Sequence, residues 1–154
     1  MRNAPDADAV LRQGLRLVSI QWTIQVAVVL AIGVVTPLVV KPAEAPGAAS
    51  RFLTAIFVVV SLLDLAIAWW FKARVLPANL RRARTDAEAA GMIAGPAFVF
   101  VSLASTPALL GLALYLTQGD RVGLGVLFTI SLAGHWLLKP RYEEWQVMVL
   151  ERGR

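Results

Sequence analysis

A chain of 154 residues has the length of one domain, since independently folding units run to about 100 to 200 residues. Hydrophobic residues make up 58% of it and charged residues only 16%, whereas ordinary globular domains are about 45 to 50% apolar and about 25% charged. A soluble fold of this size could not cover so much apolar surface, so the composition predicts a single integral membrane domain over residues 1–154. The net charge is +5, but the basic residues flank apolar segments, where they are typical of orientation signals and lipid contacts. The lipid bilayer is therefore the expected partner, and nucleic acid is not.

Four apolar segments are long enough to cross a bilayer as helices. They cover residues 17–40, 52–71, 89–117 and 122–138. A hydrocarbon core of about 30 Å takes about 20 helical residues at about 1.5 Å each. The fourth segment is the shortest, but basic residues at both of its ends can reach the interface and extend the length that it spans. The sequence predicts an all-α fold, a polytopic four-helix membrane bundle.

The polar segments predict how these helices are connected. Residues 72–85 are strongly basic and are expected to form a loop, which ends where Thr85 and Glu88 have the capping-box spacing that starts a helix. A tight turn is expected at 118–120, between the third and fourth helices. The tail over residues 141–154 has large apolar residues at spacings of three and four, which indicates a short amphipathic helix on the membrane interface. A solvated tail with aromatic anchors is the alternative.

The distribution of Lys and Arg predicts the orientation. Twelve of the fifteen lie before the first helix, in the second connection or after the fourth helix, and three lie on the opposite side. By the positive-inside rule, both termini are expected in the cytoplasm. Arginine outnumbers lysine twelve to three, and alanine, glycine and valine are abundant, which is typical of a GC-rich bacterial genome. The expected location is the bacterial cytoplasmic (inner) membrane, with a multi-pass chain in the N-in, C-in orientation.

One carboxylate, Asp64, lies within a predicted span. An ionisable group at this depth costs at least about 2.5 to 3.5 kcal/mol to insert, so it needs a partner or a purpose. Counted from the helix ends, Gln25 lies at nearly the same depth as Asp64, and His135 lies about one turn nearer the cytoplasmic side. Together with Ser105 of the third helix, these residues form a candidate intramembrane polar cluster.

Two interpretations of this cluster remain open. In the first, Asp64, Gln25 and His135 form a pocket that passes protons or binds a ligand, because imidazole and carboxylate groups can both change charge. In the second, Asp64 is protonated or bonded to Gln25 and holds helices together, which is a common role of polar residues inside membranes. His135 taken alone is expected at the interface, where it would reach toward lipid head groups.

Two further groups of residues have simple structural interpretations. Ser105 and Thr106 precede Pro107, and hydroxyl groups in that position are expected to satisfy the backbone carbonyl that a proline leaves unbonded. Trp69 and Trp70 are followed by basic residues, which is typical of an aromatic belt at the cytoplasmic interface.

Enzymes and metalloproteins are not indicated by the residue inventory. The chain has no cysteine and one histidine, which excludes disulfides, thiolate sites, multi-histidine metal cages and a haem held by two histidines of one chain. Phosphate-binding loops, zinc-protease motifs and serine-hydrolase elbows do not occur in the sequence. No catalytic residue, cofactor or metal is therefore expected.

The stretch over residues 92–145 contains A-S-T-P-A-L-L-G-L-A-L at 104–114 and L-K-P-R-Y-E-E-W at 138–145. With these motifs it resembles a group of uncharacterised bacterial four-helix membrane proteins. In that group a Glu often stands two residues before the proline, in a pattern similar to the proton-carrying helix of rotary ATPase proteolipids. Here Ser105 stands at that position, and serine cannot carry a proton by titrating. The first helix also lacks the repeated glycines of proteolipids, and the predicted orientation is the reverse of theirs, so a rotor role is not expected.

These observations predict a non-enzymatic structural or interaction component of the membrane, acting as a homo-oligomer or as a subunit of a larger complex. The alternative is a small proton-coupled transporter or channel that uses Asp64 and His135.

Overall fold

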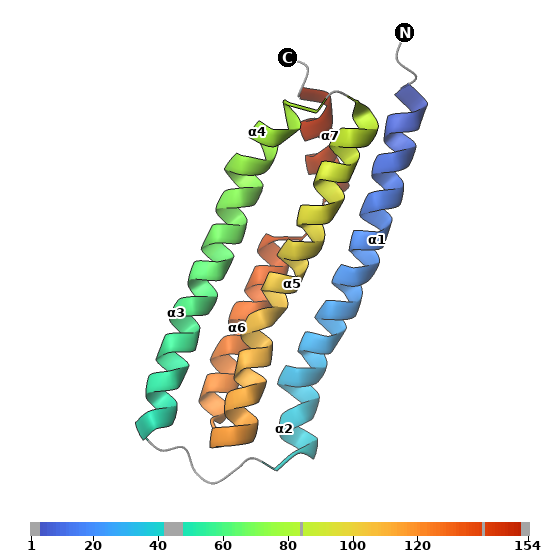
Figure 1. Cartoon of the computed structure of the whole chain (residues 1–154). Coiled ribbons are helices and arrows are strands. Elements are labelled where there is room, and N and C mark those ends of the chain that lie inside the picture. Colours follow the sequence, from blue (N-terminus) through green and yellow to red (C-terminus); the bar gives the residue numbers. More distant parts are fainter. Residues whose placement is uncertain (1–3, 42–47, 84, 140, 152–154) are drawn as a thin grey trace.

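The computed structural model describes residues 4–41, 48–83, 85–139 and 141–151, and in these ranges it contains helices and no strand. The described chain is therefore all-α, as the sequence predicts. Its long helices stand side by side with α5 in the middle (Figure 1). In chain order the elements are α1 (Ala4–Leu30), η1 (Ala31–Val35), α2 (Thr36–Val39), α3 (Ala48–Trp70), η2 (Phe71–Val75), α4 (Leu76–Leu80), α5 (Asp86–Gln118), α6 (Arg121–Leu137) and α7 (Tyr142–Glu151).

The first two helical rods, α1–η1–α2 and α3–η2–α4, each contain one widened turn just before a proline. Proline has no N–H, and its ring crowds the carbonyl four residues earlier in a regular helix. In the turns η1 and η2 the hydrogen bonds reach five residues back, from Thr36 N to Ala31 O and from Leu76 N to Phe71 O. The π-type turn accommodates the proline, so each rod continues past it.

The turn between α5 and α6 has the predicted position and residue chemistry. Gly119 adopts a left-handed backbone conformation with φ of 69°, which glycine accepts without steric cost, and its N–H caps the carbonyls of Leu114 and Tyr115. Asp120 then caps α6 by accepting a hydrogen bond from Gly123 N to Oδ1 at 2.7 Å. At the other end of α5, the Thr85 hydroxyl accepts from Glu88 N at 3.1 Å, which confirms the predicted cap.

Three segments from distant parts of the sequence meet at one end of the molecule. Figure 1 shows the start of α1, the short helix α4 and the terminal helix α7 at this end, while α2 and the start of α3 lie at the other. In α7 the Trp145 side chain is only 1% exposed, and Tyr142 and Met148 also pack against the core. The described part of the tail is thus a packed helix and not a solvated segment.

Three described helices are long and apolar enough to cross a membrane. They cover Arg12–Val39, Arg51–Leu80 and Gly91–Gln118. The helix α6 has 17 residues, and it adds a fourth candidate only when it is taken together with α7, across a bend of 51°. In the most apolar stretch of each of these three helices, the buried share of residues is 11% for the first, 17% for the second and 44% for the third. The first two rods therefore turn most of their apolar side chains outward.

The helix α5 is the centre of the packing. It lies against α6 and α1 most extensively, and also against α3. Six of its buried residues belong to one core cluster with residues of α1, α3, α4 and α7 and with Leu138, which follows α6. From α5 this cluster contains Ala89, Ile93, Ala97, Phe100, Val101 and Ala104.

Glycines allow two close approaches between helices. An added Cβ on Gly134 of α6 would lie 2.7 Å from Leu65 Cδ2 of α3, and one on Gly111 of α5 would lie 3.2 Å from the Leu124 Cα of α6. Small residues at such crossings let helices pack tightly, as is typical inside membranes.

The predicted loop over residues 72–85 is wrong for most of its length. The helix continues through η2 and α4 to Leu80, so the connection to α5 is short. Leu76 and Leu80 are 2% and 0% exposed, and their burial fixes this part of the rod against the core. Lys and Arg are good helix formers, so a run of basic residues does not mark the end of a helix. The first rod likewise begins at Ala4, well before the charge-free stretch that starts at residue 17.

Candidate functional site

Three of the four residues in the predicted polar cluster meet between α1, α5 and α6. The Ser105 hydroxyl donates to Gln25 Oε1 at 2.6 Å, and its oxygen lies 3.3 Å from His135 Nε2. One side chain of α5 thus contacts a polar side chain on each of two other helices. Such interhelical contacts stabilise membrane helices by roughly 0.6 to 2 kcal/mol each.

A second serine of α5 extends this network along α1. The side-chain amides of Gln21 and Gln25 each approach Ser102 Oγ at 3.5 Å, and the Ser102 hydroxyl donates to Phe98 O at 3.0 Å. Gln25 therefore has a serine partner for both its carbonyl oxygen and its NH₂ group.

His135 is buried inside the molecule, so the expectation that it reaches toward lipid head groups is wrong. Its side chain is 2% exposed, and Nδ1 lies 2.9 Å from Ser131 O. Because a carbonyl oxygen only accepts, Nδ1 carries a proton in this arrangement. The indole of Trp22 lies beside this helix end: it donates to His135 O at 3.1 Å, and the Lys139 ammonium lies 5.1 Å from its ring centroid.

Asp64 stands apart from the network. It is half-buried on α3 and has no hydrogen bond or ion pair with any residue that the structure describes. The expected bond to Gln25 is not formed, because α1 and α3 lie on either side of α5 (Figure 1). Counting residues placed Gln25 and Asp64 at a similar depth, but depth does not determine the direction in which each helix faces.

An apolar cavity of about 330 Å³ lies on the same side of α3 as Asp64. Ile67 and Phe71 follow Asp64 by three and seven residues, so they share its helical face, and both line this cavity. The α5 side is formed by Pro96, Val99, Phe100 and Leu103. The carboxylate is thus one turn away from an apolar hollow between α3 and α5.

The hydroxyls beside Pro107 do not have the predicted partner. Pro107 leaves the carbonyl of Leu103 without its usual donor. Ser105 and Thr106 approach the carbonyls of Val101 and Ser102, each at 3.4 Å, and these belong to the preceding turn. For Ser105, the contact with Gln25 is much shorter, so its main role is between helices.

Sequence reasoning missed a buried carboxylate at the end of the molecule opposite α7. Asp120 is 6% exposed, and its Oδ2 accepts a hydrogen bond of 2.5 Å from the Thr54 hydroxyl of α3. Its Oδ1 caps α6 through Gly123 N. A Cβ on Gly123 would lie 2.6 Å from Oδ2, so a larger residue there would displace the Asp120 carboxylate. The pattern Asp-x-x-Gly predicts the helix cap, but nothing local indicates the contact with Thr54.

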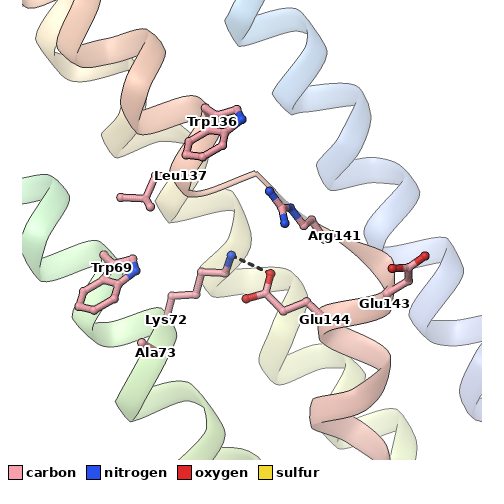
Figure 2. A pocket seen from close by; sticks show the side chains of 8 residues that line it. All are labelled: Trp69, Lys72, Ala73, Trp136, Leu137, Arg141, Glu143 and Glu144. Atoms are coloured by element: carbon pink, nitrogen blue, oxygen red, sulfur yellow. Dashed lines mark hydrogen bonds and ion pairs between the residues drawn. The ribbon is translucent and has the colours of Figure 1, made fainter.

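A second site missed by the sequence reasoning is a cavity of about 410 Å³ at the α7 end (Figure 2). On its floor the Lys72 ammonium forms an ion pair with Glu144 Oε2 at 3.0 Å. Lys72 is only 6% exposed and lies 5.9 Å from the Trp145 ring centroid. We expected Lys72 to act as one of the orientation charges, but it joins α7 to the second rod. The lining residues are Trp69, Lys72, Ala73, Trp136, Leu137, Arg141, Glu143 and Glu144.

Metal-ligating side chains do not gather in the described part of the chain: no three His, Asp or Glu residues there are placed to hold one ion. Comparison with family profiles, curated proteins and solved structures finds no match to this chain. The network around Ser105 and the cavity around Lys72 are therefore interpreted from their chemistry alone.

Proposed function

We propose that the chain is an integral protein of the bacterial cytoplasmic membrane that crosses it four times, with both termini in the cytoplasm. Three helices have the length and apolarity for this. The fourth span is α6, whose 17 residues rise about 26 Å and which returns along α5 after the tight turn at Gly119. Of the eleven basic residues that the structure describes, eight lie in segments toward the α7 end and three lie toward the opposite end, which supports a cytoplasmic position for the α7 end.

Within that membrane we propose a non-enzymatic structural or interaction role. The observation that carries this proposal is that the polar side chains between α1, α5 and α6 bond one another. Gln25, Ser105 and His135 each have an interhelical or backbone partner, and Ser131 of α6 donates to Ala104 O of α5 at 2.6 Å. Such bonds join the helices to one another.

The apolar outer surface supports a partner in the membrane. The first two rods expose a run of large apolar side chains, and lipid or neighbouring protein chains would cover them. A homo-oligomer or a larger membrane complex fits this surface. The exposed set includes Leu17, Ile20, Ile24, Val28, Val59, Leu62, Leu63 and Ile67.

The similarity to proteolipid helices adds no proton-carrying role. At the position of the carboxylate, Ser105 donates to Gln25 and serves as a contact between helices.

A small proton-coupled transporter is the second candidate, and the observation that favours it is Asp64. A half-buried carboxylate inside a span, without a described partner, is a functional-site hypothesis by default.

Two substitutions of Asp64 separate the two roles. Under the structural proposal Asp64→Asn and Asp64→Leu should both unfold in detergent at the wild-type temperature or above, because Gln25 keeps its serine partners and an unpaired carboxylate is removed. Neither should change proton flux in proteoliposomes, and wild-type flux should equal that of empty liposomes. If the wild-type protein carried protons and a folded Asp64→Asn protein did not, the transporter would replace the structural role. Thr129→Val is the matched control, since Thr129 is exposed and bonds only its own helix at Gly125 O.

A further inference from the structure

The cavity at the α7 end has an apolar side and a charged side. Figure 2 shows the rings of Trp69 and Trp136 with Leu137 on one part of its wall, and Lys72, Arg141 and Glu144 on the other. Trp136 is 69% exposed and Trp69 is 51% exposed. Large aromatic rings with this exposure are typical of the level where lipid head groups meet acyl chains.

The four charged side chains that line the cavity have no net charge, because two are basic and two are acidic. Lys72 and Glu144 neutralise each other in their ion pair at 3.0 Å, in which Lys72 is the buried partner. Arg141 and Glu143 remain, and both are exposed and have no hydrogen bond or ion pair to the described residues through their side chains. The cavity lining thus includes one guanidinium and one carboxylate without a described partner, beside the Lys72–Glu144 ion pair that joins α7 to η2.

This pair of groups matches a ligand that carries both charges. A guanidinium binds a phosphate through two parallel hydrogen bonds, and a carboxylate accepts hydrogen bonds from a primary ammonium group. The cavity of about 410 Å³ is within the usual range of about 300 to 1,000 Å³ for small-molecule sites. An anionic head group without an amine would leave the carboxylate of Glu143 without a partner.

We propose that this cavity binds the phosphoethanolamine head group of a membrane phospholipid. Arg141 binds the phosphate, Glu143 binds the ammonium group, and the first part of the acyl chains lies against Trp136 and Leu137. The inference rests on the proposed membrane location of the chain, because it places the cavity at the cytoplasmic interface.

Native mass spectrometry of the delipidated protein in detergent tests the site with single lipids. Phosphatidylethanolamine should bind roughly tenfold more tightly than phosphatidylcholine, whose quaternary ammonium cannot donate a hydrogen bond to Glu143. Glu143→Gln should remove that preference. Arg141→Gln should weaken both lipids, whereas Arg74→Gln, an exposed basic residue on η2 outside the cavity, should change neither.

Three results would overturn the lipid site while leaving the proposed function intact. The first is equal binding of both lipids by the wild-type protein, and the second is tighter binding of phosphatidylglycerol than of phosphatidylethanolamine. The third is displacement of bound lipid by an equal concentration of free phosphoethanolamine, which would show that the site takes a soluble phosphate ester. Release of the protein from membranes by alkaline carbonate would instead contradict the proposed function itself, and with it the lipid site.

Discussion

The Ser105 hydroxyl touches polar groups of two neighbouring helices, so its contribution to stability can be measured with small substitutions. Ser105→Ala should lower the free energy of unfolding by roughly 0.6 to 2 kcal/mol. Gln25→Leu should have a similar effect, and the double variant should lose less than the sum, because both substitutions break the same 2.6 Å bond. Thermal unfolding in detergent measures all three. Strictly additive losses would show that the two side chains do not interact.

Lys72 and Glu144 form a pair in which one partner is deeply buried. Glu144→Ala should therefore destabilise the protein by about 1 to 3 kcal/mol, because it leaves the Lys72 ammonium unpaired. Replacing both by Lys72→Met and Glu144→Ala should recover part of this loss, since an apolar side chain has no charge to leave unpaired. Glu143→Ala is the matched control on the same turn of α7. If Glu144→Ala and Glu143→Ala were equally mild, the ion pair would not hold α7 in place.

At this scale the sequence predicts three members of the polar cluster correctly and places the fourth, Asp64, wrongly. Gln25, Ser105 and His135 belong to the predicted cluster, and they do lie together. Asp64 is predicted to join them because the ends of the apolar segments indicate how deep a residue lies along its helix. Rotation about the helix axis and the order of helices around α5 come from packing between distant segments, which one sequence does not display. For the same reason the contacts of Thr54 with Asp120 and of Lys72 with Glu144 were missed.

At the scale of the helices, two glycines of α6 can be compared, because one is crowded by a neighbouring helix and the other is not. Gly134 faces Leu65 of α3, where an added Cβ would lie at 2.7 Å, whereas nothing lies within 4 Å of a Cβ on Gly125. Gly134→Val should destabilise the protein by about 1 to 3 kcal/mol through overpacking. Gly125→Val should be neutral or slightly stabilising, since valine has a higher helix propensity than glycine. Comparable losses in the two variants would place α3 elsewhere.

The length of the apolar segments predicts that the helices form. Their ends are predictable only where capping residues stand next to the end in the sequence. Thr85 with Glu88, and Gly119 with Asp120, mark ends that the structure confirms. The sequence predicts the end of the second rod too early, because a run of basic residues is also typical of a polar loop. The continuation through η2 depends on the burial of Leu76 and Leu80 and on a π-turn before Pro77, and both are consequences of tertiary packing.

For the whole molecule, the central claim is a four-span orientation with α4 and α7 on the cytoplasmic side. The structure brings the start of α1, α4 and α7 to one end (Figure 1). The number of spans depends on α6, which is the shortest of the long helices. If α6 did not cross, α7 would lie on the opposite side of the membrane from α4.

Single cysteines test this claim most directly, because the chain contains none of its own. Ala78→Cys lies on α4, Val147→Cys lies on α7, and Val122→Cys lies next to the turn at the opposite end; all three side chains are exposed. A membrane-impermeant maleimide applied to intact spheroplasts should label Val122→Cys alone, and it should label the other two only after the membrane is permeabilised. Labelling of Val147→Cys in intact spheroplasts, with Ala78→Cys protected, would contradict the four-span orientation.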